Sequence, residues 1–154
     1  MQRVVYIFIF LILPLYSLEL FVIADKNFPE SNLTRSEIAS MFLDKKRFIK
    51  EEKILVMNHK VGTLLRYCFE KNILKKTERS LERYWRKAYY QGRRPPKIVS
   101  SIEMLFLYLK SVHPAIGYSD LNITLNQEIQ ILYRVECEKS LKNVLLNRAD
   151  GFKQ

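Results

Sequence analysis

A short polar loop, residues 60–63, separates an apolar run from a helical pattern and carries groups that suit an anion. The amides at the start of a helix point outward, and the helix dipole favours negative charge there. Gly62 lets a ligand approach the backbone, Thr63 adds a hydroxyl, and Arg66 can form two hydrogen bonds to an oxyanion from one turn further on. These three residues therefore predict an anion-binding site. In the simpler alternative, Thr63 only caps the helix and Arg66 is a solvated charge.

Residues that typically perform catalysis or bind metals occur without a recognisable pattern. His59 and His113 lie far apart in the sequence, and no H-E-x-x-H, C-x-x-C or G-x-S-x-G motif is present. The neighbouring acids Glu51 and Glu52 fall in a charged loop, which is typical of a solvated surface. We therefore expect no enzymatic activity, no catalytic residue, no metal site and no cofactor.

The N-terminal segment, residues 1–17, has the composition of a secretory signal peptide. Arg3 gives a basic start, residues 4–13 form an unbroken apolar run, and Ser17 offers a small residue at a cleavage point. The alternative is a membrane anchor, but a spanning helix needs about 20 apolar residues. We expect cleavage before Leu18, a periplasmic location, and contact with the membrane only through the uncleaved segment.

The net charge indicates the kind of partner, and the cysteine content allows one disulfide. The whole chain has a net charge of +10, and the signal segment carries one cation and no acid, so the remainder keeps +9. A basic protein outside the cytoplasm meets anionic lipid, small anions or acidic polymers. Cys68 and Cys137 are the only cysteines, and an oxidising compartment permits one disulfide between them. Two buried thiols are the alternative, and the sequence leaves both open.

The segment 75–97 is the most basic part of the chain, with nine Lys or Arg residues and two acidic residues. Its cations Arg79, Arg83 and Arg86 share one face of an expected helix. The opposite, apolar stripe contains Leu81, Tyr84, Trp85, Ala88 and Tyr89. Because the aromatic residues fall on this stripe, we expect Trp85 in the core, a solvated basic face and no nucleic-acid partner. If that face binds anything, an anionic membrane surface or an acidic protein fits an exported protein better.

Strand-like and helix-like patterns alternate along the chain. The expected strands occupy residues 18–24, 53–60, 115–118 and 129–135. Two helices are expected to begin with capping boxes, in which a hydroxyl and a Glu three residues later bond each other's backbone. These boxes are Thr34 with Glu37 and Ser100 with Glu103. The alternation predicts an α/β domain with a partly parallel sheet flanked by helices. We place this domain at residues 18–137, followed by a C-terminal helix and tail at 138–154.

Five short segments then occur in a familiar order. They are LTRSEIASMFLDKKR (33–47), KILVMNHKVGTLLRYCF (53–69), YW (84–85), GRRPPKIVSSIEMLFLYL (92–109) and HPAIGYSD (113–120). This order resembles the periplasmic phosphate-binding protein of phosphate ABC transporters, in its short single-unit relatives. Those proteins show a helix ending in a phrase like iFLGK, a strand running into a Ser-Gly-Thr phosphate loop, a YW helix, a Gly-Pro-Pro turn and a pGAIGY segment. The resemblance covers residues 19–136.

The resemblance implies a periplasmic-binding-protein-like fold that binds inorganic phosphate or a similar oxyanion. It assigns the ligand to Gly62, Thr63 and Arg66, and it implies a transporter or another periplasmic protein as partner. Among the departures from the family pattern, Val61 replaces a serine and Asp44 replaces a glycine. The alternative is a degenerate family member that has lost the ligand and acts as a periplasmic interaction or accessory protein through its basic face.

Overall fold

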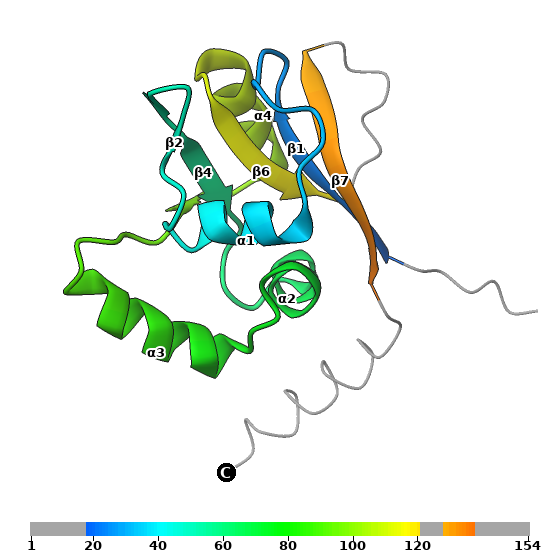
Figure 1. Ribbon diagram of the computed structural model, residues 1–154. Coiled ribbons are helices and arrows are strands. Elements are labelled where there is room, and N and C mark those ends of the chain that lie inside the picture. The colour runs from blue at the N-terminus through cyan, green and yellow to red at the C-terminus, as the bar shows by residue number, and fades with distance from the viewer. Residues whose placement is uncertain (1–17, 121–127, 138–154) are drawn as a thin grey trace, which may run out of the picture.

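The computed structural model describes residues 18–120 and 128–137, and a five-stranded sheet forms its centre (Figure 1). The strands lie in the order β5-β4-β6-β1-β7. They are β1 (Leu18–Asp25), β4 (Leu55–Asn58), β5 (Lys97–Ile98), β6 (Ala115–Ser119) and β7 (Ile129–Cys137). β4 pairs in parallel with β5 and β6, whereas β1 runs antiparallel to β6 and β7. The predicted α/β fold with a partly parallel sheet is confirmed.

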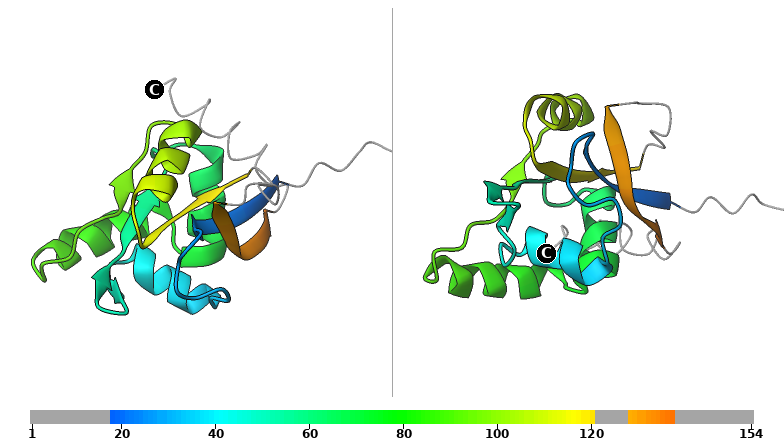
Figure 2. Two further views of the ribbon diagram at one scale, coloured as in Figure 1. Left: turned by 90° about the horizontal axis from the view of Figure 1, so that it is seen from above. Right: turned by 45° about the horizontal axis from the view of Figure 1, so that its top comes forward.

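Helices cover both faces of this sheet (Figure 2). One face carries α1 (Arg35–Phe42), α2 (Leu64–Phe69) with its π-helical continuation η1 (Glu70–Leu74), and α3 (Glu78–Tyr89). The other face carries α4 (Ile102–Ser111). A small hairpin of β2 (Phe48–Ile49) and β3 (Glu52–Lys53) lies between α1 and β4 in sequence. None of the described helices is long and apolar enough to cross a membrane.

β1 is apolar from Leu20 to Ala24 because both of its faces are covered there. Successive strand side chains point to opposite faces, so Leu20, Val22 and Ala24 join the cluster beneath α1 and α2. Phe21 and Ile23 join the smaller cluster beneath α4. An unbroken apolar run, rather than a polar alternation, is therefore what a central strand requires here.

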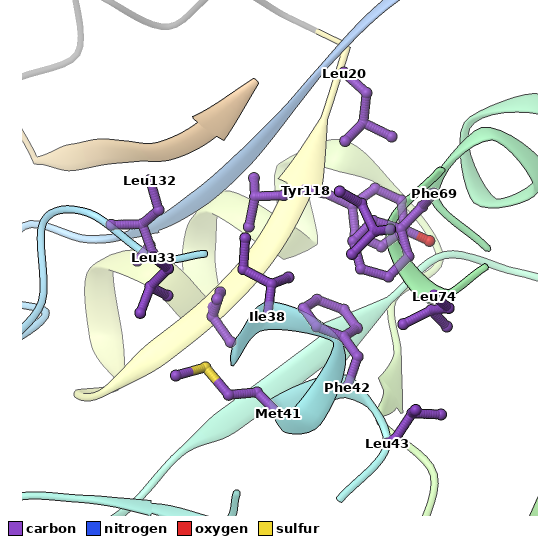
Figure 3. Close-up of a cluster of buried hydrophobic side chains, with 14 of the residues drawn as sticks. Leu20, Leu33, Ile38, Met41, Phe42, Leu43, Phe69, Leu74, Tyr118 and Leu132 are labelled. Atoms are coloured by element: carbon purple, nitrogen blue, oxygen red, sulfur yellow. The ribbon is translucent and has the colours of Figure 1, made fainter. Parts of the chain in front are cut away.

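Three aromatic rings fix the larger core cluster (Figure 3). Phe69 from α2 stacks on Tyr118 from β6, with ring centroids 4.1 Å apart and planes 4° apart. Phe42 from α1 packs against Phe69 at 4.4 Å. These contacts hold α1 and α2 against β6.

The predicted helix starts are largely confirmed. Thr34 forms the expected capping box, since its hydroxyl accepts from the Glu37 amide at 3.3 Å and the Glu37 carboxylate accepts from the Thr34 amide at 2.8 Å. The Thr34 hydroxyl also donates to the Glu37 carboxylate at 2.7 Å, and this bond, together with the one from the Thr34 amide, lowers the pKa of Glu37. The second predicted cap, Ser100, is wrong by one residue, because Ser101 caps α4. The Val99 amide still bonds the Asn58 carbonyl at 2.9 Å, which extends the β5 pairing and delays the helix.

The two cysteines form a disulfide that joins α2 to β7. The Cα atoms of Cys68 and Cys137 are 5.8 Å apart, and both residues are buried. This finding decides between the two alternatives that the sequence allowed.

α3 is less buried than its apolar stripe predicts. Leu81 and Ala88 are buried, but Trp85 is only partly buried and Tyr89 is 59% exposed. The C-terminal end of α3 projects beyond the body of the domain, so the core does not reach Tyr89 there (Figure 1). The prediction that Trp85 is a core residue is therefore only partly right, because Trp85 packs against the core without being fully buried. The expected signal peptide and C-terminal helix lie outside the described residues.

Candidate functional site

The carboxyl ends of the parallel strands β5, β4 and β6 meet at one edge of the sheet. The chain leaves β4 to begin α2 on one face and leaves β5 to begin α4 on the other. Open α/β sheets bind ligands in the crevice outside such strand ends, where the connections turn to opposite faces. The predicted anion loop lies at this edge.

The loop between β4 and α2 is exposed and tightly turned. Gly62 has a φ of +88°, a left-handed conformation that suits glycine. The Thr63 hydroxyl accepts from the Arg66 amide at 3.3 Å and donates to the Lys60 carbonyl at 3.0 Å. Thr63 thus caps α2, as the simpler alternative held, and its hydroxyl also closes the loop. The Arg66 amide is taken by this cap, whereas the amides of Leu64 and Leu65 at the start of α2 have no intrahelical acceptor.

Arg66 lies beneath this loop instead of in solvent. Its side chain is 14% exposed, and its Nε lies 2.6 Å from the Glu70 carboxylate. Its Nη1 donates to the His59 carbonyl at 2.9 Å. The structure therefore brings Gly62, Thr63 and Arg66 together within one helical turn. It also gives Arg66 two partners that the sequence analysis did not name, so the alternative of a solvated Arg66 is wrong.

A hydrogen-bonded network joins the ends of β4 and β6 beside the loop. The Tyr118 hydroxyl donates to the side-chain carbonyl of Asn58, and the His59 Nε2 lies 2.8 Å from the Tyr118 carbonyl oxygen. Burial raises the pKa of Tyr118 well above its usual range, so the phenol remains a donor. Sequence reasoning missed Asn58 and Tyr118, although a polar residue directly after an apolar strand was the available signal.

A second polar cluster lies at the opposite edge of the sheet, where β1 ends and β6 begins. The buried Asp25 carboxylate accepts from the Ala115 amide at 2.8 Å and the Asn27 amide at 3.0 Å, and it lies 2.7 Å from His113 Nδ1. The other ring nitrogen of His113 is 3.5 Å from Glu52. These contacts tie β1, β6 and the hairpin together. Among the described residues, no group of His, Cys, Asp and Glu is arranged to hold a metal ion.

Asp44, the family's glycine position, has a structural role. Its φ is +52°, which is why a glycine suits the position. Its carboxylate accepts from the Arg94 amide at 2.8 Å and pairs with Arg47 at 3.1 Å. Arg47 also donates to the Gly92 carbonyl at 3.0 Å. Asp44 therefore anchors the segment that returns from α3, and a cavity of about 270 Å³ lies beside this anchor.

No protein-family model matches the sequence, and no curated protein matches it significantly. Solved structures do share its architecture. An ABC-type phosphate transport receptor from Vibrio cholerae is 16% identical with a TM-score of 0.56, over 76% of this chain and 47% of that one. The chain has the fold of phosphate-binding proteins of ABC transporters. The resemblance inferred from five sequence segments is thus confirmed at the level of the fold.

Two further solved structures give the same result. A putative phosphate ABC transporter substrate-binding protein with bound phosphate, from Clostridium perfringens, is 18% identical with a TM-score of 0.58, over 73% of this chain and 43% of that one. PstS from Borrelia burgdorferi is 16% identical with a TM-score of 0.54, over 75% and 47%. The chain therefore spans less than half the length of each of these three proteins.

Proposed function

We propose that this domain binds phosphate or a similar oxyanion at the loop between β4 and α2, without chemical conversion. The observation that carries the proposal is the exposed turn at Gly62, which opens the first amides of α2 at the ligand edge of the sheet. The buried Arg66 lends positive charge from beneath. The phosphate bound to the substrate-binding protein from Clostridium perfringens, whose fold this chain shares, supports the choice of anion.

Each predicted residue has a distinct part in this proposal. Gly62 allows close approach of the anion to the backbone. Thr63 holds the loop closed, because its hydroxyl already bonds the Lys60 carbonyl and the Arg66 amide. Arg66 supplies charge and hydrogen-bond donors. Val61, which is 58% exposed, offers no hydroxyl where the resembling family has a serine, so we expect weak binding.

The proposal also concerns the location of the protein and its partner in the cell. We infer that the N-terminal segment directs export, and that the anion-loaded domain meets a transporter or another periplasmic protein. The loop at Gly62 is exposed in this domain. An exposed site encloses less of its ligand, so we expect weaker binding than in an enclosed pocket.

The test is a calorimetric titration with inorganic phosphate at low salt. Wild type should give a weak, saturable heat, and Val61→Ser should bind more tightly, by about tenfold for one added hydrogen bond to a charged group. Thr63→Ala should weaken binding because the loop opens. Thr77→Ala is the matched control, since Thr77 caps α3 with the same 3.3 Å hydrogen bond but lies outside the loop.

The outcome can also exclude the proposal. If neither wild type nor Val61→Ser gives heat with phosphate, the loop binds no oxyanion. If Thr77→Ala weakens binding as much as Thr63→Ala, the effect reflects general stability and the site assignment fails.

A further inference from the structure

One face of α3 carries a straight row of three arginines that ends in a tyrosine. Arg79, Arg83, Arg86 and Tyr90 follow one another at intervals of four, three and four residues, which places them on the same side of the helix. This side lies opposite the buried Ala88. We call these four residues the arginine stripe. At the rise of an α-helix it is about 16 Å long.

The guanidinium groups of the stripe have no partner inside the described part of the domain. Neither an ion pair, nor a hydrogen bond, nor a ring contact involves Arg79, Arg83 or Arg86 within residues 18–120 and 128–137. Two arginines elsewhere in the domain do have partners. Arg66 pairs with Glu70, and Arg94 lies over the Tyr89 ring at 4.3 Å. The stripe is therefore a set of cations that form no ion pair in the described part of the domain.

The position of the stripe exposes it to solvent. All three arginines are exposed, and Tyr90 is 87% exposed. The end of α3 that bears Tyr90 projects from the domain in both further views (Figure 2). Segment 75–97 carries nine cations against two acids, so the surrounding potential is positive as well. The stripe is therefore an exposed, basic surface on one side of α3.

We propose that the arginine stripe docks the domain onto an anionic lipid surface. Guanidinium forks match phosphate oxygens in two-point hydrogen bonds, as lipid headgroups offer them. A basic row on an amphipathic helix is typical of attraction to anionic lipid, and an exposed tyrosine suits the headgroup region. This surface contains none of Gly62, Thr63 and Arg66, so the proposal is independent of oxyanion binding.

Lipid fits the stripe better than the two other anionic partners. Single-stranded nucleic acid needs a series of aromatic side chains on which successive bases stack. The stripe has only Tyr90, at one end. A protein partner anchors side chains in pockets at the centre of its interface, whereas the stripe is the outer side of a single projecting helix (Figure 1).

The test is sedimentation of the full chain with vesicles. One set contains only phosphatidylcholine, and the other contains equal parts of phosphatidylcholine and phosphatidylglycerol. Any insertion of the apolar N-terminal segment occurs with both sets of vesicles. The additional binding to the anionic vesicles therefore measures the contribution of the arginine stripe. Changing Arg79, Arg83 and Arg86 to Gln together should weaken the additional binding to anionic vesicles about a hundredfold, because each lost cation lowers the affinity about fivefold.

A matched control removes the same charge elsewhere. Lys26, Lys45 and Lys50 are exposed and have no side-chain partner among the described residues, so their joint change to Gln should weaken the additional binding only a few fold. Changing the three arginines to Lys keeps the charge and the fold, and it should retain most of the binding. This variant keeps the test decisive if the Gln variant does not fold.

Three results would overturn the proposal. The first is equal binding of wild type to neutral and anionic vesicles. The second is an equal loss in the arginine and lysine variants, because net charge alone would then explain binding. The third is complete displacement from anionic vesicles by polyglutamate or by single-stranded DNA at equal charge concentration, which would assign the stripe to an acidic protein or to nucleic acid.

Discussion

Nε of Arg66 lies 2.6 Å from the carboxylate of Glu70, and the two side chains are only 14% and 8% exposed. Glu70 is the first residue of the π-helical turn η1, directly after α2. The cation that we assign to the anion therefore already has a carboxylate partner, one turn further along the chain. An oxyanion at the loop has to share Arg66 with Glu70, and the two negative charges repel each other across the guanidinium.

This competition predicts the effect of Glu70→Gln. The glutamine retains an acceptor for Arg66 but removes the negative charge, so phosphate binding should become tighter by roughly 1 kcal/mol, or about fivefold in Kd. Arg66→Ala should weaken binding instead. Calorimetric titration with phosphate measures both. Unchanged affinity in both variants would show that Arg66 takes no part in binding the anion.

The disulfide between Cys68 and Cys137 predicts a stability that depends on redox conditions. It links residues 69 positions apart, and in the chain-entropy description a loop of that length stabilises the fold by about 4 kcal/mol. Denaturant titrations with and without a reductant should differ by about this amount. The double variant Cys68→Ala/Cys137→Ala should be insensitive to the reductant. A wild type whose midpoint does not move on reduction would contradict the prediction.

Local patterns in the sequence predicted much of the fold because they depend on short distances along the chain. The apolar run of β1 and the capping box at Thr34 are of this kind, as is the cap at Thr63. The pair of Arg66 and Glu70 also has a local signature, since residues four apart on a helix are neighbours. Neither of the two interpretations of Arg66, as an anion-binding residue or as a solvated charge, included this pair.

Contacts between distant segments could not be predicted in this way. Asn58 meets Tyr118 only because β4 and β6 are adjacent in the sheet, and their residues are 60 positions apart. Asp25 meets His113 across 88 positions because β1 runs antiparallel to β6. Strand order is set by the packing of the whole domain, which the pattern of one segment does not contain. The exposure of Tyr89 has the same origin, since it depends on where α3 leaves the body.

Gly117→Ala should destabilise the domain by overpacking. A Cβ atom at Gly117 would lie 2.5 Å from Cδ1 of Leu105, which is fully buried between α4 and β6 and has little room to move. We expect a loss of about 2 kcal/mol in the free energy of unfolding. Leu105→Ala in the Gly117→Ala background is the control, because the methyl group then occupies vacated space. The losses of stability in the two single variants, Gly117→Ala and Leu105→Ala, should add to more than the loss in the double variant. Simple additivity would argue against the clash.

Trp85→Ala tests how firmly α3 packs on the domain. Trp85 is partly buried against the main core and contacts the Tyr84 ring edge-on at 4.9 Å. Tyr84 in turn donates to the Leu43 carbonyl at 2.6 Å. We expect a loss of about 2 kcal/mol in a denaturant titration, below the roughly 3–5 kcal/mol of a fully buried aromatic residue. Tyr90→Ala is the matched control, because that side chain is 87% exposed and its removal should change stability by less than about 0.5 kcal/mol. Equal losses in the two variants would mean that α3 is held by its backbone connections alone.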